Sequence, residues 1–315
     1  ITQEKEMPVI IKPESEAHWL KLRTEDVTST ESAALFGLSP YATAFELWHR
    51  KKSGEVPEFH QNERMVWGTR LQDAIARGIA DDHGWTVRKL NTYMRHTDTA
   101  GMGSSFDFEI VSHDDGPGIL EIKAVDFIAF RDNWLVDGDK IEAPEHIEIQ
   151  LQHQLEVANR EWGVIGALIG GNTVRVLTRK RDREVGAALR RAVENFWMSI
   201  NLDQEPKPVY PQDAEMVCSL HQYAEPGKIY DAQGNAEIAS LVAEYHQAGA
   251  DERDAKERKE TAKARILSVI GDAERVLLEG FSVSAGVVGP AMIEAYERKG
   301  YRNFRVTAKK HKVAA

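Results

Sequence analysis

The segment Ser104–Lys123 constrains the fold of this chain more than any other part of the sequence. Two stretches, Ser104–Ser112 and Ile119–Val125, read as strands and flank the sequence His113-Asp114-Asp115-Gly116-Pro117-Gly118. Glycine and proline clustered between two such stretches are typical of a tight chain reversal. The segment therefore predicts an antiparallel hairpin. Asp107 and Glu121 are equally far from the centre of this turn, so we expect them to lie opposite each other within a residue or two.

The predicted hairpin carries a small polar site on one strand face. Successive side chains of a strand point to opposite faces, so Glu121 and Lys123 share one face and Leu120 and Ile122 the other. Opposed strand positions bring carboxylates so close that they repel unless a cation lies between them. Hard oxygen ligands suit Mg²⁺, with Mn²⁺ as a substitute. Lys123 could then orient water and stabilise negative charge during phosphodiester hydrolysis. The alternative is a plain salt bridge on an edge strand.

Composition and cysteine usage exclude several other classes of protein. The chain has 315 residues, 42% hydrophobic and 29% charged, which is typical of a globular protein of one or two domains. A single cysteine, Cys218, excludes an intramolecular disulfide, a thiolate zinc site and an iron–sulfur cluster. We find no phosphate-binding loop, no apolar run long enough to span a bilayer and no signal peptide. We therefore expect a cytoplasmic protein with no nucleotide cofactor.

Helical and strand patterns alternate along most of the chain and predict an α/β fold, a mixed sheet flanked by helices. Pro206, Pro208 and Pro211 mark a linker, which divides the chain into a core of residues 1–205 and a mainly helical region of residues 206–315. Helices are expected at 14–22, 32–37, 44–52, 62–83, 127–135, 144–158, 182–202, 236–247 and 250–278. Further strands are expected at 85–90, 93–96, 164–169, 173–178, 281–283 and 304–306.

Short motifs in the first two thirds of the chain occur in the order and spacing of a known family. They are Trp19-Leu20-Lys21-Leu22-Arg23, Thr28-Ser29-Thr30-Glu31-Ser32, Gly37-Leu38-Ser39-Pro40-Tyr41, Trp67-Gly68, Ser105-Phe106-Asp107, Leu120-Glu121-Ile122-Lys123, Gln150-Leu151-Gln152-His153-Gln154-Leu155 and Leu168-Ile169-Gly170-Gly171. Over residues 14–200 the chain resembles the phage-type exonucleases of the YqaJ viral recombinase group, which includes lambda exonuclease. The resemblance implies a restriction-endonuclease-like PD-(D/E)XK core.

The resemblance also implies a role for each matched residue. Asp107, Glu121 and the backbone carbonyl of Ile122 would be metal ligands, and Lys123 would be the catalytic lysine. Arg23, Thr30 and Ser105 match positions that bind the 5′-phosphate of DNA. Arginine offers a planar fork for phosphate, and hydroxyl groups add neutral donors. Arg23 could instead be a surface residue beside Trp19, and Thr30 a plain helix cap.

Three glutamine residues leave questions open. Gln150 and Gln152 match a Gln-X-Gln helix motif beside the active site. Side chains two positions apart on a helix diverge by about 200°, so at most one can point into the site, and we favour Gln152. The family usually has a glutamate at the position of Gln72, and an amide there would hold a second metal ion less strongly.

We therefore expect a Mg²⁺-dependent exonuclease of phage or prophage origin, acting in a bacterial host on double-stranded DNA ends, 5′ to 3′. The resemblance further implies a ring-shaped trimer and a single-strand annealing protein as partner. The alternatives are a catalytically weak DNA-end-binding scaffold and an endonuclease on the same core. The net charge of -10 argues against broad contact with DNA. However, Arg298–Lys312 holds seven Lys and Arg residues and no acid, and Arg179-Lys180-Arg181 is a second basic cluster. Each could contact phosphates, or the first could be a solubilising tail.

Overall fold

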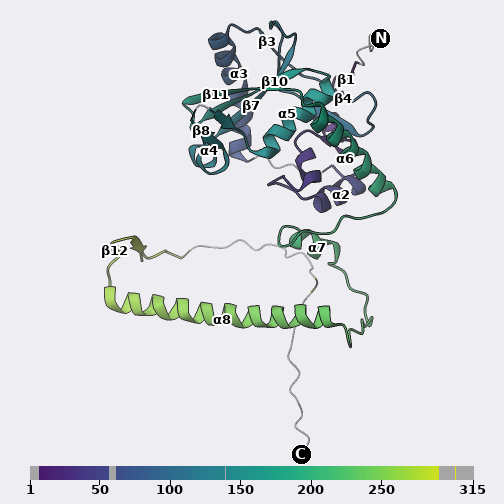
Figure 1. The fold of residues 1–315 in the computed structure, drawn as a ribbon. Helices are drawn as coiled ribbons and strands as arrows, with labels where there is room; N and C mark the ends of the chain where they lie inside the picture. The colour runs from purple at the N-terminus through teal and green to yellow at the C-terminus, as the bar shows by residue number, and fades with distance from the viewer. Residues whose placement is uncertain (1–6, 57–61, 139, 291–301, 303–315) are drawn as a thin grey trace, which may run out of the picture. The chain divides into compact units, whose positions relative to one another are not determined.

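The computed structural model describes residues 7–56, 62–138, 140–290 and 302, and Figure 1 shows its helices and strands. The chain forms two compact units, Ile1–Val217 and Cys218–Ala315. The first unit continues through the proline-rich segment that suggested a boundary at residue 206. Asp213 holds this segment on the core, because its carboxylate accepts hydrogen bonds from the Thr43 hydroxyl and the Val209 amide, both at 2.6 Å.

The centre of the first unit is a five-stranded sheet in the order β11-β10-β7-β6-β3. Its strands are Thr173–Lys180, Trp162–Ile169, Gly118–Val125, Phe108–Ile110 and Val87–Lys89 in that order. β7 and β10 pair in parallel, whereas the other neighbours are antiparallel. A second sheet has the order β1-β4-β5-β2, with strands Val9–Ile11, Tyr93–Arg95, Met102–Ser105 and Val27–Thr28. The structure thus confirms a mixed-sheet α/β fold.

Each face of the five-stranded sheet has its own apolar cluster. Leu120 and Ile122 of β7 pack with helix α3 (Glu63–His83) through residues such as Ile79. Ile119, on the opposite face, packs with helix α5 (Glu145–Ala158) through Leu151 and Leu155. This alternation is the one expected from the period of a strand. It leaves Glu121 and Lys123 on the α5 face.

A glycine in β10 allows α3 to lie close to the sheet. A Cβ atom added to Gly166 would come within 2.5 Å of Ile79 Cδ1, so a larger residue would force the Ile79 side chain to move. The position of α3 matters because this helix also carries Gln72 towards the end of β6.

Several expected elements are present with small changes in their ends. The remaining helices of the first unit are α1 (Glu16–Glu25), α2 (Ala44–Ser53), α4 (Phe127–Asn133) and α6 (Arg183–Asn201), with a short 3₁₀ helix η1 (Ser32–Phe36). The expected strand 104–112 is split into β5 and β6, which belong to different sheets. The expected helix 127–135 ends at Asn133, because Leu135–Asp137 (β8) pairs with Lys140–Glu142 (β9). Helix α7 (Ala214–Leu220) had no expected counterpart.

The second unit contains one long helix and a hairpin. Helix α8 (Ala236–Ile270) is continuous where two helices were expected, and Gly271 ends it. The prediction that this helix continues to residue 278 is wrong, because Arg275–Leu278 (β12) is a strand that pairs with Phe281–Ser284 (β13). The expected strand 304–306 lies outside the described residues, as does all of Arg298–Lys312 except Arg302. Among the residues described, no helix is both long enough and apolar enough to cross a membrane.

Candidate active site

Asp107 lies where the chain leaves one sheet and enters the other. β5 ends at Ser105 and β6 begins at Phe108, which pairs with Leu120. Continuing this register by one residue places Asp107 opposite Glu121, as the symmetry of the hairpin predicted. The Asp107 carboxylate accepts a hydrogen bond from the Ile122 backbone N–H and another from Gln72 Nε2, both at 2.9 Å. Asp107 is therefore fixed by β7 on one side and by α3 on the other.

Glu121 and Lys123 form the second half of the site. Lys123 Nζ donates to Glu121 Oε1 at 2.8 Å, and both side chains face α5. Gln150 joins the two, since its Oε1 accepts from Lys123 Nζ at 2.8 Å and its Nε2 donates to Glu121 Oε1 at 2.6 Å. Gln154 Nε2 donates to the other Glu121 oxygen at 2.7 Å. Two amides from one helix thus orient the carboxylate and the ammonium group.

The choice of Gln152 over Gln150 is wrong. Gln152 Nε2 donates to the Lys180 carbonyl at 2.9 Å, and its Oε1 accepts from the Asp182 backbone N–H at 2.8 Å. It therefore joins α5 to the start of α6 and is directed away from Glu121. The physical reason is the helical period: positions 150 and 154 are one turn apart and share a face, whereas 152 lies on the far side. Gln154 is a site residue that the sequence argument missed.

The two carboxylates influence each other electrostatically. Burial of the carboxyl group and the nearby charge of Glu121 raise the pKa of Asp107 to about 7. Burial lowers the pKa of Lys123, but the charges of Glu121 and Asp107 outweigh it, so this pKa lies above its ordinary value. Burial and the second carboxylate therefore impose an electrostatic penalty on the ionisation of Asp107. A cation between the two groups would remove this penalty.

The donor set at this site fits a hard divalent cation. Asp107 and Glu121 offer two carboxylate groups, and Mg²⁺ commonly binds one or two carboxylates of a protein. Among the described residues, no cluster of three or more His, Cys, Asp or Glu side chains could hold a metal ion. The remaining ligands would have to be a backbone oxygen, water or substrate. Gln72 contributes an amide that donates to Asp107, and Asp73 forms an ion pair with Lys89.

Arg23, Thr30 and Ser105 lie together beside this site. Arg23 donates to the Thr30 hydroxyl at 3.3 Å, and its guanidinium lies 4.8 Å from the centroid of the Trp19 ring. Trp19 Nε1 donates to the Ser105 hydroxyl at 2.7 Å. Gln154 then connects the Ser105 carbonyl, at 3.2 Å, with Glu121. The three residues therefore form one cluster with Trp19, which the sequence argument did not assign to the site.

Thr30 does not act as a helix cap. The 3₁₀ helix η1 has Glu31 at its N-cap position, with no capping hydrogen bond from a side chain. The Thr30 hydroxyl lies instead 3.2 Å from the Thr28 hydroxyl and accepts from Arg23. Thr30 is exposed at this point, so its hydroxyl can reach a ligand that Arg23 also binds.

A cleft of about 1830 Å³ opens beside Lys123. Its lining includes Tyr41, Arg64, Lys140, His146 and Arg175. The Tyr41 side chain is 78% exposed, and its ring meets that of His146 edge-on at 5.6 Å between centroids. Burial and the charge of Lys123 lower the pKa of His146, which favours the neutral imidazole. The lining also includes Glu142, Glu145 and Glu148, so the cleft presents cationic, acidic and aromatic groups beside Lys123.

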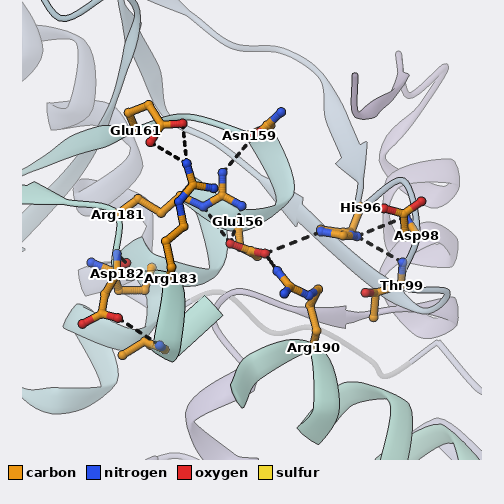
Figure 2. A network of polar contacts seen from close by, with 12 residues as sticks. His96, Asp98, Thr99, Glu156, Asn159, Glu161, Arg181, Asp182, Arg183 and Arg190 are labelled. Atoms are coloured by element: carbon orange, nitrogen blue, oxygen red, sulfur yellow. Dashed lines mark hydrogen bonds and ion pairs between the residues drawn. The ribbon is translucent and has the colours of Figure 1, made fainter. Parts of the chain in front are cut away.

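A buried ionic network holds α5 in place at the end away from the cleft (Figure 2). Glu156 is 1% exposed and forms ion pairs with Arg181 of the β11–α6 loop, at 2.7 Å, and with Arg190 of α6. His96 Nε2 lies 3.7 Å from the same carboxylate. Arg181, from the basic cluster at 179–181, is therefore paired inside the core. Arg179 of that cluster pairs with Glu148 at 2.8 Å.

These features define a class of α/β protein in which an Asp and a Glu-X-Lys motif meet at the junction of two strands. Residues 18–161 match the model of the YqaJ-like viral recombinase domain. The uncharacterized protein YqaJ of Bacillus subtilis (strain 168) is 29% identical over 186 residues, which are 58% of this chain. The matched segment spans 56% of the length of that relative.

Solved structures with a similar chain path include two described as exonucleases. The alkaline exonuclease LHK-Exo of Laribacter hongkongensis is 19% identical, with a TM-score of 0.47, over 60% of this chain and 94% of its own. A phage-related exonuclease from Haemophilus somnus 129PT is 11% identical, with a TM-score of 0.36, over 56% of this chain and 96% of its own.

Proposed function

We propose that this chain is a Mg²⁺-dependent deoxyribonuclease that hydrolyses double-stranded DNA from its ends in the 5′ to 3′ direction. The observation that carries the proposal is the contact network of Asp107, Glu121 and Lys123. Two carboxylates that need a cation lie beside an ammonium group that is held by hydrogen bonds. The match of residues 18–161 to the YqaJ-like viral recombinase domain supports DNA as the substrate.

Asp107 and Glu121 would hold the metal ion, with the Ile122 carbonyl as a further ligand. When bound, the ion supplies a Lewis acid and an activated water for attack on phosphorus. The chain's own residues do the positioning. Gln72 and the Ile122 N–H fix Asp107, whereas Gln150 and Gln154 fix Glu121. Lys123 Nζ can donate a hydrogen bond to a phosphate oxygen and so stabilise the charge that develops there.

The cluster of Arg23, Thr30 and Ser105 supports binding of a terminal phosphate. A guanidinium group recognises phosphate by two parallel hydrogen bonds, and the stacked Trp19 ring limits how far Arg23 can move. The cluster is joined to the carboxylate pair through Gln154. Binding of a 5′-phosphate by this cluster would favour digestion from the 5′ end, which is the proposed polarity.

Assembly and partners follow from the family resemblance alone. A ring-shaped trimer around DNA would explain processive digestion without contacts to specific bases. The single-stranded product would be the substrate of an annealing protein. Mass measurement of the purified chain and a pull-down with that annealing protein test these two expectations separately.

The decisive experiment compares linear DNA with covalently closed circular DNA in the presence of Mg²⁺. The proposal expects mononucleotides from linear DNA, no cutting of circles, and faster digestion of 5′-phosphorylated ends. Cleavage of circles would support an endonuclease instead. Binding of linear ends without hydrolysis would support a scaffold, an alternative that Gln72 in place of a glutamate keeps open.

The site assignment is tested by Lys123→Ala, with Lys228→Ala as a matched control. Lys228 is exposed and pairs only with Glu225 among the described contacts of its ammonium group. We expect Lys123→Ala to abolish hydrolysis while DNA binding stays near the parent value. Lys228→Ala should retain full activity. Hydrolysis by the Lys123→Ala chain would overturn the assignment.

A further inference from the structure

Helix α8 presents apolar side chains that the described residues leave open to solvent. None of its residues is buried, and the exposed fractions of Leu241, Ile266 and Val269 are 58%, 43% and 86%. A helix of 35 residues is about 52 Å long, far longer than the helices of a small domain. Most of the stability of a helix in a protein comes from packing of one face, so α8 requires a surface that covers this stripe.

Two rows of residues, each with a spacing of seven positions, run side by side along α8. One row consists entirely of apolar residues, namely Leu241, Ala248, Ala255, Ala262 and Val269. A second row, three positions earlier in each heptad, consists of Ile238, Tyr245, Glu252, Lys259 and Ile266. A period of seven residues matches the seam of a left-handed coiled coil. The occupant that suits such a seam is another helix with the same repeat.

The charges beside this seam are divided between the two halves of the helix. One flanking row carries Glu244 and Asp251 in the first half and Arg258 and Arg265 in the second. A parallel pair of α8 helices would place Glu252 against its own copy in the seam, and Lys259 likewise. An antiparallel pair avoids both contacts and brings the acidic half of one helix against the basic half of the other.

We propose that α8 pairs with α8 of a second copy of this chain as an antiparallel two-stranded coiled coil. In this register Leu241 lies opposite Ile266 of the partner subunit, and Ile238 opposite the partner's Val269. The flanking rows then place Glu244 beside the partner's Arg265 and Asp251 beside the partner's Arg258. The apolar residues at each end of the seam then pack on apolar residues of the partner subunit. Each of the four charged side chains lies beside one of opposite charge. The small alanine residues in the middle permit close approach of the helices.

This pairing is independent of the proposed nuclease function. The seam lies in the second unit, whereas the carboxylate site belongs to the first. The pairing is two-fold, so it links chains in pairs and would add to any assembly that the first unit makes. The readouts below concern association alone, and thermal unfolding followed by circular dichroism serves as a check that each variant is folded.

Disulfide trapping tests the direction and register of the pair. The experiment uses the full chain with Cys218→Ser, because Cys218 is exposed and would otherwise react. We expect an equimolar mixture of Leu241→Cys and Ile266→Cys chains to form a cross-linked heterodimer on oxidation, while neither variant alone cross-links. Cross-linking of Leu241→Cys with itself would indicate a parallel pair. That result, or the absence of any cross-link, would overturn the proposal.

Charge exchange tests the partner's identity by sedimentation. Glu244→Arg alone and Arg265→Glu alone should each weaken association by about tenfold, since each places like charges together at two symmetric sites. The double variant Glu244→Arg with Arg265→Glu should restore the association of the parent chain. Glu257→Arg, on the outer face of the helix, is the matched control and should change nothing. The pairing would be contradicted if all four variants associated equally. It would also be contradicted if the parent chain showed no association that depends on α8.

Discussion

At the scale of single residues, the Glu121 carboxylate is defined by what holds it. Gln150 and Gln154 donate to its two oxygens, and Gln150 also accepts from Lys123. A carboxylate ligand that is free to rotate would present its oxygens to a metal ion only part of the time. Partners of this kind commonly change metal affinity or activity by about 10- to 100-fold when they are removed.

The first prediction follows from that geometry. Gln150→Ala and Gln154→Ala should each lower the rate of DNA hydrolysis by about 10- to 100-fold. Gln152→Ala should leave the rate near that of the parent, because Gln152 contacts Lys180 and Asp182 instead. Single-turnover rates on linear DNA, measured beside thermal unfolding, separate loss of positioning from loss of fold. A low rate for Gln152→Ala with normal stability would contradict this view of α5.

The second prediction concerns Gln72, whose amide donates to Asp107. Gln72→Glu replaces a donor by a third carboxylate beside a group that already resists ionisation. In chelator, we expect the free energy of unfolding to fall by about 1–3 kcal/mol. Mg²⁺ should restore more stability to this variant than to the parent and should activate it at a lower concentration. Thermal unfolding across a Mg²⁺ titration measures both effects, and an unchanged response to Mg²⁺ would count against a metal site here.

The third prediction uses His153, which is fully buried on α5 and whose ring nitrogen Nε2 lies 3.1 Å from the Gly103 carbonyl. Burial lowers the pKa of His153 to about 4. Between pH 6.5 and 4 the unfolded chain therefore binds a proton at this residue that the folded chain does not. The stability contributed by neutral His153 is complete above pH 6.5 and is lost as the pH falls.

The variant His153→Gln isolates this effect, because glutamine retains a donor but cannot titrate. We expect the variant to have a lower free energy of unfolding than the parent at pH 7.5. This difference should be about 2 kcal/mol smaller at pH 5. Urea unfolding in chelator at the two pH values gives the difference. A gap that does not change with pH would show that the histidine is not held neutral.

At the scale of elements, α5 depends on the buried carboxylate of Glu156. Removal of this group leaves Arg181, whose side chain is 6% exposed, without its counter-ion. We therefore predict that Glu156→Ala costs about 3–5 kcal/mol of stability. The matched control is Glu161→Ala, which breaks an ion pair with Arg183 that is largely exposed, for less than about 1 kcal/mol. Urea unfolding of both chains measures the difference, and equal costs would refute a special role for Glu156.

The sequence allowed prediction of elements whose causes are local. The register of Asp107 against Glu121 follows from the central position of the turn between the two strands. The helices α2 and α3 follow from apolar spacing and from the glycines Gly54 and Gly84 that end them. The break between β5 and β6 could not be predicted in this way. It arises because two sheets compete for the same stretch, which is a property of the whole fold.

The site shows the same division between local and tertiary causes. The pattern Glu121-X-Lys123 predicted a shared face, because the strand period is local. The choice between Gln150 and Gln152 required the rotation of α5 about its axis, and that rotation is fixed by contacts such as Leu151 and Leu155 in the core. Trp19 and Gln154 carry no spacing signal towards Ser105. Their contacts exist only after α1, α5 and β5 have packed together.

At the scale of the whole molecule, the net charge of -10 is compatible with a DNA substrate if positive groups are confined to its path. Arg179 and Arg181 are paired with acids inside the first unit. Arg175 and Lys140 line the cleft beside Lys123, and Arg23 lies with the hydroxyl groups of Thr30 and Ser105. Weak attraction elsewhere would let an enzyme move along DNA after each cut. The charge therefore limits where DNA can bind, not whether it binds.

The division into two units yields the last prediction. The site residues and both apolar clusters lie in the first unit, and a chain that ends at Gln222 keeps α7 whole. We expect this shortened chain to hydrolyse linear DNA at the parent rate per active site, because no described contact of Asp107, Glu121 or Lys123 comes from beyond it. It should also lose the α8-dependent association, so sedimentation and single-turnover kinetics on one preparation test both units. A shortened chain that is folded but inactive would mean that the second unit contributes to catalysis. Retained association would place the contact between copies in the first unit.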